Sequence, residues 1–263
     1  LPAALCSISI ALILKFNEGR GGNRILIAGA NYLVASAISF FMIQDRFASP
    51  SLATVALGGL SGAVYVLGFI ALMAAIARGP LAATVTVARL AVVIPVVVSI
   101  AVWRETPGTA QWVGIALGLA AIALFGFGIS AEKRKAGRGY GSLLLALFLV
   151  LGTGDVLLKA FREWALDGDR RVFTWILFTA AALFTWIIIA ARRVRFDRRT
   201  FALGLLLGIP NLFSTVFTLL ALRTAGASVA FPLINLAVIA GSTVLGLVIW
   251  RERPGRVGLA GLA

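Results

Sequence analysis

The stretch Trp103-Arg104-Glu105-Thr106-Pro107-Gly108 closes a long apolar run that begins near residue 81. A second apolar run, residues 228–249, closes in the same way with Trp250-Arg251-Glu252-Arg253-Pro254-Gly255, and five of the six residues are identical. The two stretches lie 147 positions apart, a little over half of the 263 residues. The chain is therefore predicted to contain two copies of one structural unit, with its function between the copies.

The composition is that of a membrane protein. Hydrophobic residues make up 60% of the chain and charged residues 13%, whereas a soluble protein is closer to half apolar and a quarter charged. The apolar residues come in runs of about 20, the length at which a helix crosses a bilayer. The predicted fold class is all-α and polytopic, in the inner (plasma) membrane, with the lipid bilayer as a partner.

Ten membrane-spanning segments are predicted, and both ends of the chain are expected to be incomplete. The segments cover residues 1–16, 25–43, 52–77, 81–103, 111–129, 142–164, 172–191, 200–222, 228–250 and from 257 onward. The start of the first helix and most of the tenth are therefore expected to be missing. The basic loop 132–141 divides a first five-helix repeat, residues 1–131, from a second, residues 142–263.

The repeat continues inside the segments. At an offset of 146, Gly58 and Gly62 align with Gly204 and Gly208, and Arg89-Leu90-Ala91-Val92 aligns with Asn235-Leu236-Ala237-Val238. Because five is odd, the second copy must enter the membrane from the opposite face, which predicts an inverted repeat with a pseudo-two-fold axis in the membrane plane. Such a repeat allows alternating access to one central site, although duplication could also have built only a larger bundle.

The distribution of charge excludes several functions. The net charge of +14 resides mainly in loops, where the positive-inside rule places it, so nucleic-acid binding is not expected. The chain has no histidine and one cysteine, Cys6, so neither a metal site nor a cofactor is expected. One set of alternate loops carries 16 Lys and Arg and the other carries 7, which predicts both termini outside the cell.

Arg89 is the leading candidate for substrate binding. It lies about mid-way along the fourth segment, where a cation costs several kcal/mol unless it is paired or faces water. It would bind the anionic group of a solute, or form a structural ion pair or carbonyl clamp instead. The repeat places Asn235 at the equivalent position, so an asymmetric polar site is predicted.

Asp155 is the one carboxylate predicted deep in a helix, and it is a candidate for proton coupling because burial changes how readily a carboxylate ionises. The alternative is a structural pair with Lys159, one turn along the same helix, or with Arg89. Lys15 and Lys159 are otherwise expected to lie near helix ends and to extend their amino groups to the membrane interface. Glu105 and Glu252 are expected to anchor their turns.

Polar stripes mark further candidates. Tyr65 lies on the third segment with Gly58 and Gly62, and the repeat aligns it with Asn211 on the eighth segment. The glycines are assigned to close helix packing, and Asn211 and Asn235 to a polar cavity. Pro95, Pro210 and Pro232 are expected to kink their helices.

The paired Glu-containing turns at the end of each fourth helix resemble the EamA family of the drug/metabolite transporter superfamily. Further strings fit one bacterial branch of it: Ala30-Asn31-Tyr32, Gly208-Ile209-Pro210-Asn211 and Phe231-Pro232-Leu233-Ile234-Asn235. The resemblance covers nearly the whole chain. It implies ten helices around a central cavity, adds Asn31 to the candidate substrate-binding residues, and implies cytoplasmic termini, opposite to the charge count.

The predicted function is secondary transport of a small metabolite, such as an amino-acid-like solute or an organic anion. Arg89 favours an anionic or zwitterionic substrate over a cationic drug, whose export is the alternative. A membrane enzyme would need an acid/base or metal constellation, and none is present in the sequence; a non-transport membrane scaffold is the third class. A functional monomer is plausible because one chain already holds both halves.

Overall fold

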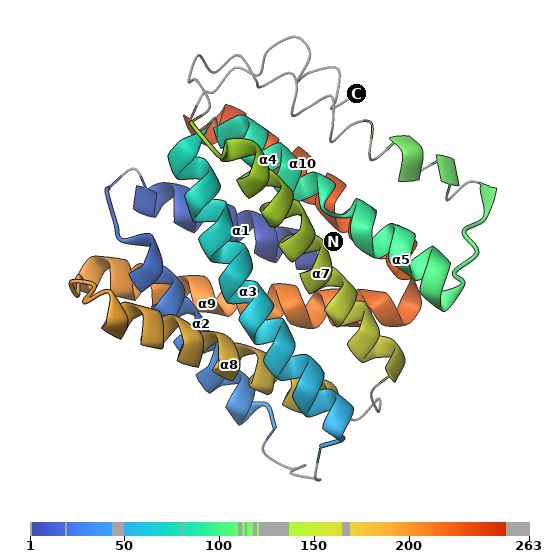
Figure 1. Cartoon of the computed structure of the whole chain (residues 1–263), viewed down its shortest axis with the longest axis horizontal. Helices are drawn as coiled ribbons and strands as arrows, with labels where there is room; N and C mark the ends of the chain where they lie inside the picture. The colour runs from blue at the N-terminus through green and yellow to red at the C-terminus, as the bar shows by residue number, and fades with distance from the viewer. Residues whose placement is uncertain are drawn as a thin grey trace. The chain divides into compact units, whose positions relative to one another are not determined.

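The computed structural model describes residues 2–18, 20–43, 50–79, 81–109, 112–113, 115–117, 120, 137–164 and 169–250. These residues form nine helices and no strand (Figure 1). The helices are α1 (Pro2–Glu18), α2 (Arg24–Phe41), α3 (Leu52–Arg78), α4 (Leu81–Leu90), α5 (Val93–Trp103), α7 (Tyr140–Trp164), α8 (Arg170–Ala191), α9 (Arg198–Thr224) and α10 (Ala227–Trp250). Most of the predicted fifth segment, the predicted tenth segment, most of loop 132–141, and Glu252 lie outside the described residues.

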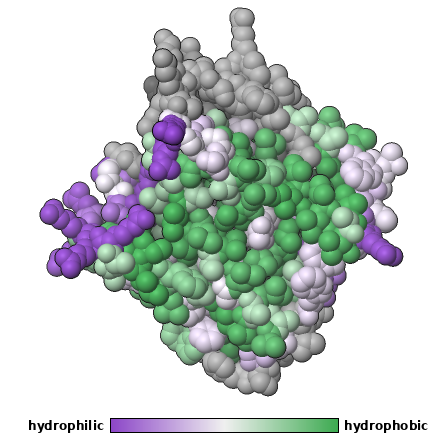
Figure 2. Space-filling model, viewed as in Figure 1, coloured by the Kyte–Doolittle hydropathy of each residue, from purple (hydrophilic) through white to green (hydrophobic). Residues whose placement is uncertain are grey.

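Six helical stretches of the described residues are long and apolar enough to cross a membrane. Many large apolar side chains on them are exposed, among them Leu183 and Ile187 of α8, at 61% and 63%. Figure 2 shows that the visible face is covered largely by apolar side chains. Lipid, rather than water, is the solvent that such a surface fits, so the predicted all-α, multi-pass membrane class is confirmed.

The predicted segment 81–103 is present as one apolar span, Ala83–Trp103, with an interruption within it. The structure has two helices, α4 and α5, separated by a turn at Ala91 and Val92. Pro95 explains the position of the break, because a proline ring clashes with the carbonyl four residues earlier, here that of Ala91. The N–H of Ile94 donates to that carbonyl at 3.0 Å, a three-residue step in place of the α-helical four. The kink expected at Pro95 is thus a complete interruption.

The chain forms two compact units, and each unit draws on both halves of the sequence. The first unit comprises Leu1–Val66 and Leu157–Arg223; the second comprises Leu67–Val156 and Thr224–Ala263. α3 and α7 therefore contribute one part to each unit. The two compact units do not test the boundary at residues 132–141 that was predicted between the sequence repeats. That boundary stays a prediction.

Glycines allow the helices of the first unit to approach closely. A Cβ on Gly204 of α9 would lie 2.6 Å from the carbonyl oxygen of Ile27 on α2, and one on Gly62 of α3 would lie 2.5 Å from that of Leu177 on α8. α2 also packs along α8 (Figure 1). Helices in lipid associate through van der Waals packing rather than through the hydrophobic effect, and such close contacts provide that packing. The assignment of these glycines to packing is confirmed.

The second unit holds a core of its own and a close pair of helices. Ala75, Tyr140 and Leu147 are buried together, and the hydroxyls of Tyr140 and Thr84 lie 3.0 Å apart in a hydrogen bond. α5 packs against α10 (Figure 1). The core therefore ties α3, α4 and α7 together through side chains at their ends, with α5 and α10 as a second pair.

Glu105 holds the start of α10, as the sequence predicted that it would anchor a turn. Its two carboxylate oxygens accept hydrogen bonds from the backbone N–H groups of Ala227 and Ser228, at 2.9 and 3.0 Å, and from the Ser228 hydroxyl at 2.7 Å. The residue before α10 is Gly226, and a Cβ there would lie 2.6 Å from the carboxylate. Because Gly226 has no side chain, the Glu105 carboxylate has room to cap the start of α10.

We expect Gly62→Ala to destabilise the protein by about 1–3 kcal/mol, because the new methyl group would overlap the α8 backbone. Gly59→Ala is the matched control, since a Cβ on Gly59 would meet nothing within 4 Å. That control should gain about 0.5–1 kcal/mol from the better helix propensity of alanine. Thermal unfolding in detergent measures both changes, and equal melting temperatures for the two variants would contradict the packing account.

We expect Glu105→Ala to destabilise the protein by about 2 kcal/mol, because an anion and three accepted hydrogen bonds are lost at a helix N-terminus. Glu105→Gln keeps one oxygen acceptor and should lose about half as much. The measurement is again thermal unfolding in detergent. A melting temperature unchanged in both variants would mean that the start of α10 does not depend on this carboxylate.

Candidate substrate-binding site

Arg89 and Asn235 form the polar centre of the second unit. Nη1 of Arg89 donates to Oδ1 of Asn235 at 3.3 Å, and Nδ2 of Asn235 donates to the carbonyl oxygen of Phe231 at 3.0 Å, one turn back along α10. The second bond orients the amide so that its oxygen faces the cation. The structure thus brings together the two residues that the sequence repeat made equivalent.

The break between α4 and α5 changes the surroundings of Arg89. The residue is mid-way along the apolar stretch Ala83–Trp103, yet it lies in the last turn of α4. The carboxyl end of a helix carries partial negative charge, which favours a cation in the last turn. The interruption at Ala91 and Val92 therefore helps to hold a cation inside an apolar span.

Asp155, on the part of α7 that belongs to the second unit, interacts electrostatically with Arg89. Lys159 belongs to the first unit and forms an ion pair with Glu163, at 2.5 Å. It is buried, with 4% of its surface exposed. The pairing of Asp155 with Lys159 stays an alternative prediction, and so does the expected extension of Lys159 to the membrane interface.

Asn31, Asn211 and Tyr65 lie in the first unit. Nδ2 of Asn211 on α9 donates to Oδ1 of Asn31 on α2 at 3.1 Å, beside the close approach that Gly208 allows to the Asn31 carbonyl. Tyr65 packs edge-on against Phe178, with ring centroids 6.5 Å apart. The predicted polar residues of this unit thus form an amide pair between two helices, and Tyr65 packs within an aromatic group.

Some polar contacts in the first unit were not predicted. The hydroxyls of Ser7 and Ser214 lie 2.9 Å apart, and those of Ser36 and Thr179 lie 2.7 Å apart, each pair joining two helices. Single Ser and Thr residues in apolar helices are common, so their partners cannot be identified before the helices are placed. The sequence offered one indication for Ser214: it lies three positions after Asn211 and therefore on a similar face of the helix.

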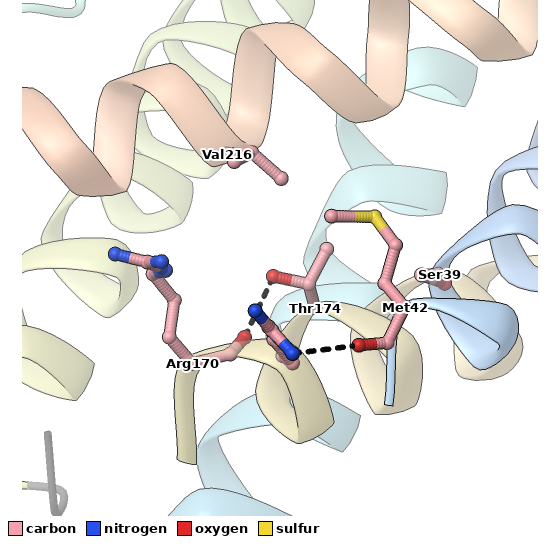
Figure 3. A pocket seen from close by; sticks show the side chains of 6 residues that line it. Ser39, Met42, Arg170, Thr174 and Val216 are labelled. Carbon is pink, nitrogen blue, oxygen red and sulfur yellow. Dashed lines mark hydrogen bonds between the residues drawn. The ribbon is translucent and has the colours of Figure 1, made fainter. Parts of the chain in front are cut away.

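A cavity of about 100 Å³ lies in the first unit, lined by Ser39, Met42, Arg170, Arg171, Thr174 and Val216. In Figure 3, Val216 on α9 faces Thr174 and Met42 across this space. The hydroxyls of Ser39 and Thr174 donate to carbonyls of their own helices, and Arg171 donates to the Met42 carbonyl at 3.2 Å. None of the residues predicted from the sequence to bind substrate lines it.

Comparison with known proteins identifies a family that matches the first part of the chain. Residues 2–127 match the EamA-like transporter family. An uncharacterized protein of Haemophilus influenzae is 24% identical over 279 aligned positions, which cover 99% of this chain and 92% of that protein.

A solved crystal structure has the same fold, with a TM-score of 0.79 and 18% identity over 99% of this chain and 91% of that one. The shared fold alone does not give a function. The chain is a multi-pass membrane protein, and its residues 2–127 match the EamA-like transporter family.

Proposed function

We propose that the chain is a secondary transporter of a small amino-acid-like or organic-anion solute, and that Arg89 binds the anionic group of that solute. The observation that carries the proposal is how few hydrogen bonds the Arg89 guanidinium makes. It has five N–H donors, and among the described residues its one hydrogen bond goes to the neutral amide of Asn235. A carboxylate can take two parallel N–H donors of the same group.

The contact between Arg89 and Asn235 also supports the inverted repeat. The two residues are 146 positions apart, the same offset at which the sequence of one copy aligns with the other. Equivalent residues of two copies touch each other where the symmetry axis passes between them. We therefore place the pseudo-two-fold axis of repeats 1–131 and 142–263 near this pair. If the two copies tilt about that axis, the Arg89–Asn235 pair would be exposed first to one side of the membrane and then to the other.

Asn31, Asn211 and Tyr65 remain proposed contacts of the solute. The amide pair has unused donors and acceptors, because each amide can make up to four hydrogen bonds and the two share one. Asn235 has the same capacity beside Arg89. We further propose that the chain works as a monomer in the inner membrane, without a cofactor.

Asp155 is proposed as the proton-coupling group. A bound anion and the Asp155 carboxylate would be two negative charges beside one cation, and like charges at such a distance disfavour joint ionisation. Uptake of one proton by Asp155 removes the repulsion. Solute binding would thereby be linked to proton binding, which a pH gradient could drive.

We expect Arg89→Ala to reduce solute flux into proteoliposomes by about 10- to 100-fold, since a charge-assisted hydrogen bond contributes about 1.5–3 kcal/mol. Arg89→Lys should keep part of the flux because it retains the charge without the planar donors. The assay uses a panel of amino acids and organic acids. Arg223→Ala removes an exposed cation and is the control; full flux in a stably folded Arg89→Ala protein would make Arg89 structural.

We expect Asp155→Asn to abolish the response of flux to a pH gradient, because the amide cannot exchange a proton near neutral pH. Flux without a gradient should persist. Glu163→Gln is the matched control on the same helix, since Glu163 is paired with Lys159, and it should keep the response. A gradient response that survives in Asp155→Asn would remove this residue from the coupling step.

A further inference from the structure

The turn between α8 and α9 carries a dense group of exposed cations. Five arginines occur within residues 192–199, and all five are exposed: Arg192, Arg193, Arg195, Arg198 and Arg199. Figure 2 shows hydrophilic side chains gathered at the left edge of the view, where Figure 1 draws this turn. None of the five makes an ion pair within 4 Å with another residue of the described chain. The cluster is therefore open to an external anion.

The one acid of the turn is already engaged. Oδ2 of Asp197 accepts the backbone N–H of Thr200 at 2.8 Å and so caps the start of α9. Hydrogen bonds from the Thr200 side chain and backbone lower the pKa of Asp197 below its ordinary value. Arg199 is the one cation of the cluster that interacts electrostatically with this carboxylate, which leaves most of the positive charge uncompensated.

Arg193 occupies a backbone position that favours glycine. Its φ is +49°, and it closes α8 in a Schellman motif: its own N–H donates to Ala190 and that of Val194 donates to Ile189, both at 3.1 Å. Glycine or asparagine is usual at this position because it adopts the left-handed conformation with little strain. The helix end therefore requires no arginine here, and the side chain needs another explanation.

An apolar side chain lies among the cations. Phe196 is 61% exposed and contacts Phe201 of α9 with ring centroids 5.1 Å apart. Trp186 of α8 lies against the same Phe201 ring at 6.5 Å. Aromatic side chains in this position, next to spanning helices, are typical of the membrane interface. An acidic protein or a nucleic acid would offer no apolar layer for Phe196.

We propose that the α8–α9 turn is a docking surface for anionic phospholipids, in which the arginines bind headgroup phosphates and Phe196 enters the layer just below them. Both flanking helices are long enough to span the membrane, so the turn lies where headgroups are. Basic residues next to a membrane span recognise anionic lipid by charge. Guanidinium groups also bind phosphate through two parallel hydrogen bonds.

The test is a titration of the purified full chain in detergent, with bound lipid counted by native mass spectrometry. Phosphatidylglycerol is compared with phosphatidylcholine of the same acyl chains. The wild type should bind phosphatidylglycerol at least about tenfold more tightly, and the difference should shrink as salt is raised. Equal affinity for the two lipids, or equally strong competition by inorganic phosphate, would overturn the assignment to lipid.

Two variants locate the surface. The triple change Arg192→Gln, Arg195→Gln and Arg198→Gln should weaken phosphatidylglycerol binding by at least about tenfold. The control triple Arg104→Gln, Arg138→Gln and Arg223→Gln removes the same charge from exposed positions elsewhere and should change it less than about twofold. Equal losses in the two triples would overturn the proposal.

Arg193→Gly separates charge from folding at a single position. Glycine suits the left-handed backbone, so the melting temperature should stay the same or rise. Binding of phosphatidylglycerol should fall by about fivefold, because one cation near the headgroups is lost. Unchanged binding in this variant, with the melting temperature retained, would show that Arg193 serves the helix end and not the lipid.

Discussion

The cost of holding the Arg89 cation inside an apolar span constrains the rest of the second unit. A charge at that depth costs several kcal/mol unless its surroundings compensate. Three features of the structure contribute: Arg89 lies in the last turn of α4, Asn235 presents an amide oxygen to the guanidinium, and Asp155 interacts with it electrostatically. Two of these neighbours are not strong permanent partners. In the proposed function, the neutral amide of Asn235 leaves the cation able to accept an anionic solute.

The first unit is built on a different principle. Its helices approach closely at glycines, and hydrogen bonds between single polar side chains join them, as in the Asn31–Asn211 pair. The Glu105 cap plays a comparable part in the second unit, where it ties the turn after α5 to the start of α10. In lipid such contacts gain little from the hydrophobic effect, so close fit and satisfied polar groups determine the packing.

Much of this arrangement follows from the sequence. Segment lengths and hydropathy located the helices to within about two residues, because a bilayer dictates both. The alignment of Arg89 with Asn235 anticipated their contact, and the duplicated Glu turn anticipated an anchoring role for Glu105. The break at Ala91 and Val92 was missed because a proline is compatible with either a kink or an interruption. The ion pair of Lys159 with Glu163 was not predicted, because both Asp155 and Glu163 lie one helical turn from Lys159 and spacing alone cannot choose between them.

Alternating access requires the Arg89–Asn235 pair to be reached from both sides of the membrane in turn. Cys6 is the only cysteine, so Cys6→Ser gives a thiol-free background into which Asn235→Cys can be introduced. The measurement is the rate of labelling of that thiol by a membrane-impermeant maleimide, in right-side-out and in inside-out vesicles. Alternating access predicts labelling from both faces. A thiol labelled from neither face would make the pair a structural contact, and one labelled from a single face would contradict exchange between two states.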